Sequence, residues 1–123
     1  MTILSHQEIP LNIGIGTRSR LPGHKIVTAE AGAKDCELWE QFMEQGGEIP
    51  IHYHNCEEII TFLSGQVEVT IGQEKTLVRA PASIFVPPHI MHGFRNPNPE
   101  RVHLLAFFSA SGPETLYRDE IRD

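Results

Sequence analysis

The chain carries the stretch GGEIPIHYHNCEEIITFLSG at residues 46–65, and this stretch decides the predicted fold. Alternating and β-branched residues predict two short strands, at about 49–54 and 58–63. The pair Asn55-Cys56 offers a turn between them, and Ser64-Gly65 offers a tight hairpin turn after the second. The stretch therefore predicts strands joined by short turns, with no room for a helix.

The rest of the chain continues this pattern. Gly, Pro and Asn punctuate short β-branched runs, helical periodicity is hard to find, and Pro87-Pro88 and the run at 96–99 mark further turns. The pattern predicts an all-β sandwich or barrel. We predict strands at about 25–29, 36–43, 49–54, 58–63, 66–71, 75–79, 83–86, 91–95 and 101–108.

The predicted strands carry a group of residues with metal-ligand chemistry. Side chains alternate along a strand, so His52 and His54 face the same side with Cα atoms about 6.6 Å apart. Glu58 follows within reach, and an antiparallel fold can bring His92 beside it. Neutral imidazoles and a carboxylate suit Zn, Fe, Mn, Ni or Cu. Taken alone, a His-x-His pair is more often structural or on the surface.

The spacing of the whole run is more specific than its parts. Gly46, His52, His54, Glu58 and Gly65 fit the pattern G-x5-H-x-H-x3-E-x6-G, and the chain thereby resembles the first signature motif of the cupin superfamily. The second cupin motif, G-x5-P-x-G-x2-H-x3-N, is matched in part. The resemblance to the two motifs together covers about residues 35–109. The matches to the second motif are Pro87, His92 and Asn96, whereas Pro81 and His89 replace the two glycines.

The resemblance implies a cupin-type jelly roll, a double-stranded β-helix barrel. It also implies one divalent transition metal per chain, held by His52, His54, Glu58 and His92. The glycine that His89 replaces takes φ > 0 freely. Either His89 adopts a left-handed conformation, or the preceding proline corner bends differently.

Residues in phase with these ligands are expected to line a substrate pocket. They are Ile60, Phe62 and Phe94, although the same residues also suit the plain filling of a small barrel. Cys56 suits a small buried side chain better than a redox-sensitive one. The sequence does not fix whether His103, in the last predicted strand, faces inward or outward. His6, His24 and His89 are expected at the surface or in a turn.

Length and composition limit the possible domain organisation, partners and location of the protein. The 123 residues suit a single domain, 1–123, with a core at about 25–109, an N-terminal arm at 1–24 and a tail at 110–123 that forms a short C-terminal helix or a frayed turn. The net charge of −6, with no basic run, disfavours nucleic acid and anionic membranes as partners. No apolar stretch is long enough to span a bilayer. Two cysteines and no recognisable signal segment indicate a reduced, cytoplasmic protein.

Ile59 and Leu63, on the strand face opposite Glu58, indicate apolar cover on that side as well, and we expect a homodimer. For function, the leading interpretation is a metal-dependent enzyme acting on a small oxygen-bearing molecule. Dioxygenase chemistry leads, followed by isomerase or lyase chemistry. The alternatives are a non-catalytic module that binds or senses a small molecule, and an ion that only stabilises the fold.

Overall fold

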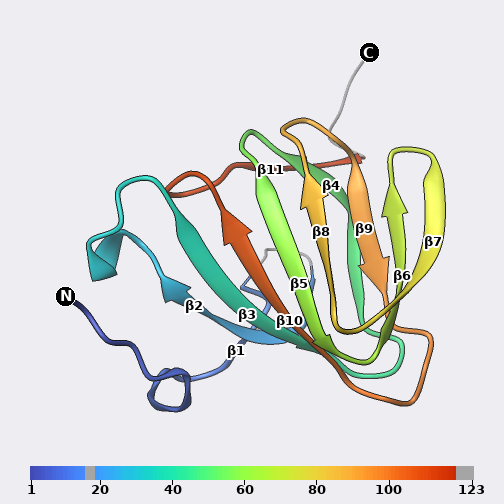
Figure 1. Cartoon of the computed structure of the whole chain (residues 1–123), viewed down its shortest axis with the longest axis horizontal. Coiled ribbons are helices and arrows are strands. Elements are labelled where there is room, and N and C mark those ends of the chain that lie inside the picture. The colour runs from blue at the N-terminus through green and yellow to red at the C-terminus, as the bar shows by residue number, and fades with distance from the viewer. Residues whose placement is uncertain (16–18, 119–123) are drawn as a thin grey trace.

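A computed structural model describes residues 1–15 and 19–118. The described strands form two antiparallel sheets that face each other (Figure 1), with the orders β1-β2-β3-β10-β5-β8 and β11-β4-β9-β6-β7. Many strands that lie side by side in a sheet are far apart in the sequence. The predicted all-β jelly roll is confirmed. The strands are β1 (Asn12–Ile13), β2 (Pro22–Val27), β3 (Glu37–Met43), β4 (Glu48–His54), β5 (Glu58–Ser64), β6 (Gln66–Ile71), β7 (Glu74–Arg79), β8 (Ala82–Val86), β9 (His92–Arg95), β10 (Val102–Phe108) and β11 (Thr115–Tyr117), and two 3-10 turns are η1 (His6–Glu8) and η2 (Ala29–Ala31).

Strands β3 to β10 lie within about one residue of the predicted ranges, because each is bounded by the turn residues that marked it. The strand predicted at about 25–29 corresponds to β2, and its start differs from the prediction. It begins at Pro22 rather than near residue 25, because Gly23 and His24 pair with Gln41 and Glu40 of β3. The sheet therefore takes in residues that the sequence placed in an N-terminal arm, and His24 is 4% exposed rather than on the surface.

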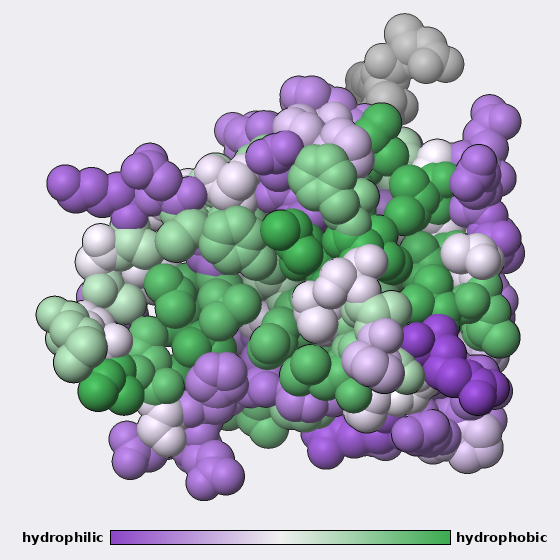
Figure 2. Space-filling model, in the orientation of Figure 1, coloured by the Kyte–Doolittle hydropathy of each residue, from purple (hydrophilic) through white to green (hydrophobic). Residues whose placement is uncertain are grey.

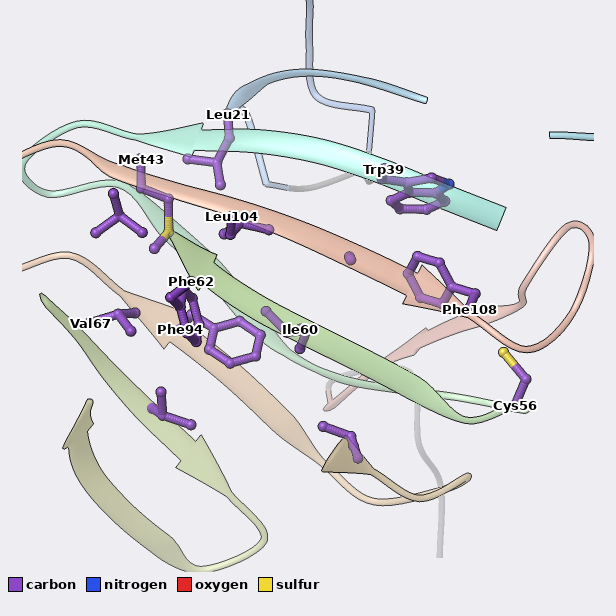
Figure 3. Packing of buried hydrophobic residues seen from close by; sticks show 14 residues of the cluster. Leu21, Trp39, Met43, Cys56, Ile60, Phe62, Val67, Phe94, Leu104 and Phe108 are labelled. Carbon is purple, nitrogen blue, oxygen red and sulfur yellow. The ribbon is translucent and has the colours of Figure 1, made fainter. Parts of the chain in front are cut away.

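The core lies between the sheets (Figure 3). Phe62 of β5 and Phe94 of β9 face each other across it, with ring centroids 5.7 Å apart. Trp39 of β3 lies 4.5 Å from Phe108 of β10 by ring centroids. Alternation along β3 thus turns Trp39 and Met43 inward, leaving Leu38 on the outer face.

An apolar row crosses the outer face of the larger sheet. Leu38, Phe107, Ile59 and Phe85 lie directly opposite one another on β3, β10, β5 and β8. The side chains of Ile59, Phe85 and Phe107 are 38–55% exposed. Figure 2 shows hydrophobic side chains gathered on this part of the molecule.

The short C-terminal helix that the sequence offered, with a frayed turn as its alternative, is not found over the described residues. Thr115–Tyr117 form β11, which pairs with β4, and residues 119–123 of that prediction lie outside the described part of the chain. The edge of β4 supplies hydrogen-bond partners that a short isolated helix lacks, so tertiary pairing overrides the local signal.

Within residues 1–15 and 19–118, no helix combines the length and the apolarity that crossing a bilayer requires.

Candidate metal centre

The adjacent strands β4 and β9 and the first residue of β5 place four polar side chains inside the barrel. His52 and His54 come from the same face of β4, as their spacing predicts. Glu58 begins β5, and His92 begins β9, paired with His52. All four are buried, with exposures of 1–6%. Each contributes one donor atom to a group whose members all lie within 4.8 Å of one another.

The orientation of each imidazole is fixed by a backbone carbonyl. The Nδ1 atoms of His52, His54 and His92 lie 2.7, 2.9 and 2.8 Å from the carbonyl oxygens of Pro50, Glu114 and Ile90. A carbonyl only accepts hydrogen bonds, so each Nδ1 carries the proton and donates. The three Nε2 atoms are then left with lone pairs that point into the barrel.

These lone pairs converge with a carboxylate. The Nε2 atoms of His52 and His54 are 3.1 Å apart, and Glu58 Oε1 lies 2.8 Å from His92 Nε2 and 3.4 Å from His54 Nε2. Four acceptors this close repel one another unless a proton or a metal ion lies among them. Nε2 coordination with Nδ1–H bonded to a carbonyl is the usual arrangement of metal-binding histidine.

Burial also favours the neutral form of His52 and His54 by lowering the pKa of each. It lowers the pKa of His52 to about 3, and the neighbouring His92 acts in the same direction. Burial likewise lowers the pKa of His54, although Glu58 opposes the shift. Neutral imidazole is the form that binds metals. Three imidazoles and one carboxylate fit a divalent transition ion, without selecting one.

His52, His54 and Glu58 open onto a small cavity of about 30 Å³, enough for one or two water-sized groups. Its wall is largely apolar. Phe94 lines it, as the sequence predicts, but Ile60 and Phe62 are not among the described lining residues and lie in the core, 1% and 0% exposed. The lining residues besides His52, His54 and Glu58 are Ser19, Trp39, Gln41, Ile49, Phe94, Phe108, Thr115 and Tyr117.

Sequence reasoning missed several of these. Thr115 and Tyr117 belong to a segment that the sequence left as a short helix or a frayed turn, whereas alternation along β11 brings both to the cavity beside His54 and His52. Gln41 shares a strand face with Trp39, and only the fold shows that this face is the inner one. Ser19 carries no local signal at all.

His89 adopts the left-handed conformation, with φ +66. Its backbone N–H donates to the carbonyl of His54 at 2.9 Å, and its ring packs near Tyr53. His89 is therefore a turn residue that replaces the motif glycine while leaving His92 in place. Cys56 is buried, 8% exposed, and belongs to the hydrophobic core.

The family model of the cupin domain matches residues 39–108, more than half of the chain. The chain belongs to the cupin family. The match spans the strands that carry all four donors, and the resemblance seen in the sequence is confirmed.

Solved structures share the fold. The polyketide cyclase RemF from Streptomyces resistomycificus superposes with a TM-score of 0.83 at 19% identity, covering 96% of this cupin and 85% of that chain. A predicted oxalate decarboxylase from Thermotoga maritima superposes with a TM-score of 0.78 at 17% identity, covering 89% and 99%. At these identities the likeness concerns the fold alone.

Among curated sequences, the auxin-binding protein 1 of Arabidopsis thaliana is 28% identical over 87 residues, 63% of this cupin and 44% of that protein. The cupin thus spans less than half the length of the curated relatives it matches.

A second group of polar residues lies on the outer face of the larger sheet. His103 belongs to it, because its side chain points away from the interior and its Nε2 lies 2.6 Å from Glu40 Oε2. His24 and His6 lie 2.7 and 3.1 Å from the other oxygen of Glu40. Burial alone raises the pKa of Glu40, but the contacts with His24 and His103 outweigh it and lower the pKa below its usual value.

Proposed function

We propose that this cupin is a metal-dependent enzyme that acts on a small oxygen-bearing organic molecule, with dioxygenase chemistry the first class to test. One observation carries the proposal: three imidazole lone pairs and one carboxylate oxygen converge inside the barrel, and three of the four donor residues line a small cavity. When bound, a divalent ion supplies Lewis acidity and coordination positions for small oxygen ligands.

The protein's own part is to orient the donors and to exclude water. Carbonyls fix the three imidazoles, and the rings of Trp39, Phe94 and Phe108 form an apolar wall. The small cavity favours a substrate that presents a few atoms, such as two adjacent oxygens, to the donors.

We propose Ser19 as the residue that orients this substrate. Ser19 is 6% exposed, lines the cavity, and its Oγ has no hydrogen-bond partner among the described residues. A buried hydroxyl without a partner gains a hydrogen bond when a polar ligand group arrives. Ser19→Ala is expected to raise KM by roughly fivefold with kcat largely retained, since one neutral hydrogen bond contributes about 1 kcal/mol.

The first experiment is elemental analysis of tag-free protein purified without added metal or chelator. His54→Ala is expected to lower the metal content by one ion per chain relative to the wild type. His89→Asn is the matched control, because asparagine tolerates the left-handed conformation and His89 is not a donor. Equal metal content in His54→Ala and the wild type would refute the site.

Oxygen uptake with diketones, catechols and flavonols then tests the reaction class. Uptake that His54→Ala abolishes supports a dioxygenase. Turnover without oxygen uptake indicates Lewis-acid isomerase or lyase chemistry, with the same residues holding the ion.

A non-catalytic binding module is the second candidate, favoured by the sequence match to auxin-binding proteins. Saturable binding of small aromatic carboxylates, without turnover of any of them, is the result expected of such a module. Product formation from a bound carboxylate contradicts it.

The homodimer and the cytoplasmic location remain predictions. The row formed by Leu38, Ile59, Phe85 and Phe107 supports a second copy of the chain as its cover. Sedimentation of the wild type as a dimer and of Phe85→Glu as a monomer is the expected result, and a monomeric wild type would exclude it.

A further inference from the structure

The second polar group lies where two separate parts of the chain meet on the outer face of the larger sheet. His24 of β2 and Glu40 of β3 are direct cross-strand partners. His6, from η1 near the N-terminus, lies over them, 34 residues away from Glu40 in sequence. His103 of β10 approaches Glu40 from the other side. Three histidines from three elements thus surround the carboxylate of Glu40.

One of the two contacts of His24 cannot be a hydrogen bond if the imidazole is neutral. His24 Nδ1 lies 2.8 Å from the carbonyl oxygen of Ile9, so it carries a proton and donates. Neutral His24 then has a lone pair on Nε2, which lies only 2.7 Å from Glu40 Oε1. Both atoms are acceptors, and His24 is 4% exposed. A positive charge, either an extra proton or a metal ion, must lie between them.

The donors lie slightly closer together than the ligands of a bound zinc ion, so a small outward shift of the side chains admits one. Zinc bonds of about 2.0–2.1 Å in a tetrahedron place ligand atoms about 3.3 Å apart. Glu40 Oε1 lies 2.7 Å from His24 Nε2 and 3.1 Å from His6 Nδ1, and the three donors lie within 4.8 Å of one another. In the barrel, the corresponding spacings are 2.8 to 3.4 Å. The two groups are thus built on the same scale.

We propose that His6, His24 and Glu40 form a second metal-binding site, for zinc or a similar divalent ion, on the outside of the barrel. His103 donates to the free oxygen of Glu40 and orients the carboxylate, while the Ile9 carbonyl orients His24. Three protein ligands leave a fourth tetrahedral position for water or another ligand.

This site ties the N-terminal segment to the sheet. His6 and Ile9 lie in the segment that precedes β1, and both contact His24 or Glu40. A hollow beside the donors is lined by this segment and by Phe42 of β3. Binding of the ion is expected to immobilise residues 5–13, because three ligands from separate elements are then fixed together.

The test is zinc stoichiometry of the full chain by equilibrium dialysis and elemental analysis, after removal of metal with a chelator. The wild type is expected to bind two zinc ions per chain. His54→Ala and His6→Ala are each expected to bind one, and the double variant none. His6 is half-exposed on η1, so the fold survives its replacement, and Gln7→Ala in the same turn is the matched control, expected to bind two.

Hydrogen exchange supplies a second readout that a structural role alone does not move. In His54→Ala, zinc is expected to slow amide exchange in residues 5–13 at least tenfold, and in the double variant to leave it unchanged. The proposal is overturned if His6→Ala binds as much zinc as the wild type, or if His54→Ala binds none. If the barrel holds no ion but the outer site does, the wild type and His54→Ala each bind one ion and His6→Ala binds none. That result contradicts the barrel site and supports the outer site.

Discussion

Asn96 offers a sharp test of how the end of β9 is held in place. Its side chain is 0% exposed, and Nδ2 donates to the carbonyls of Met43 and Glu100, each at 2.9 Å. Its Oδ1 accepts from the backbone N–H of Asn98 at 3.0 Å. Asn96 thus joins β9 to the end of β3 and to the loop before β10, which explains why an asparagine fits this position of the motif.

Asn96→Ala removes all three side-chain hydrogen bonds and leaves their partners behind. At about 1 kcal/mol for each bond, the free energy of unfolding is expected to fall by about 3 kcal/mol. For a domain of this size, that corresponds to a fall of about 10 °C in Tm. Metal content is expected to stay unchanged, because Asn96 contacts none of the four barrel donors.

Urea unfolding followed by tryptophan fluorescence measures the effect, since the chain has one tryptophan, buried in the core. Asn55→Ala is the control, because its exposed side chain accepts a single bond from the Glu114 N–H, and about 0.5 kcal/mol is expected. Asn96→Asp keeps the shape but turns a carboxylate oxygen toward two carbonyls, so it is expected to destabilise at least as much as alanine. A loss below about 1 kcal/mol in Asn96→Ala would show that these bonds do not hold the strand end.

Three further predictions concern a turn, the thiols and the metal. Gly65→Ala is expected to cost about 3 kcal/mol in urea unfolding, because φ is +89 and the new Cβ would lie 2.9 Å from a valine methyl of β10. Gly72→Ala, with φ +60 and nothing within 4 Å, is expected to cost only about 1 kcal/mol, and equal losses would contradict the steric argument. Cys36 is expected to react with a thiol reagent at least about tenfold faster than Cys56, since burial raises the pKa of the Cys56 thiol, and equal rates would contradict this. Chelation is expected to lower the Tm of the wild type more than that of His54→Ala, and equal shifts would show that the barrel donors hold no ion.

The sequence predicted the strands well wherever turn residues bound them. Ser64-Gly65 and Pro87-Pro88 are local signals that act through φ, so they operate in any context. The sequence left the segment of the Thr115–Tyr117 strand as a short helix or a frayed turn. The strand was missed because a short edge strand owes its conformation to the partner it pairs with, here β4. His24 was assigned to the surface because the sequence does not show that the first residues cover it.

For the site, the sequence alone determined that His52 and His54 share a face, because the strand period of two residues is a local property. The placement of Glu58 and His92 beside them rested on the motif, not on local geometry. Only the tertiary structure decided which face of β3 meets the cavity, that Ser19 and Tyr117 reach it, and that His6, His24 and His103 gather around Glu40. These contacts join residues up to 63 positions apart, and cross-strand register, which fixes them, is set by packing of the whole sheet rather than by any one segment.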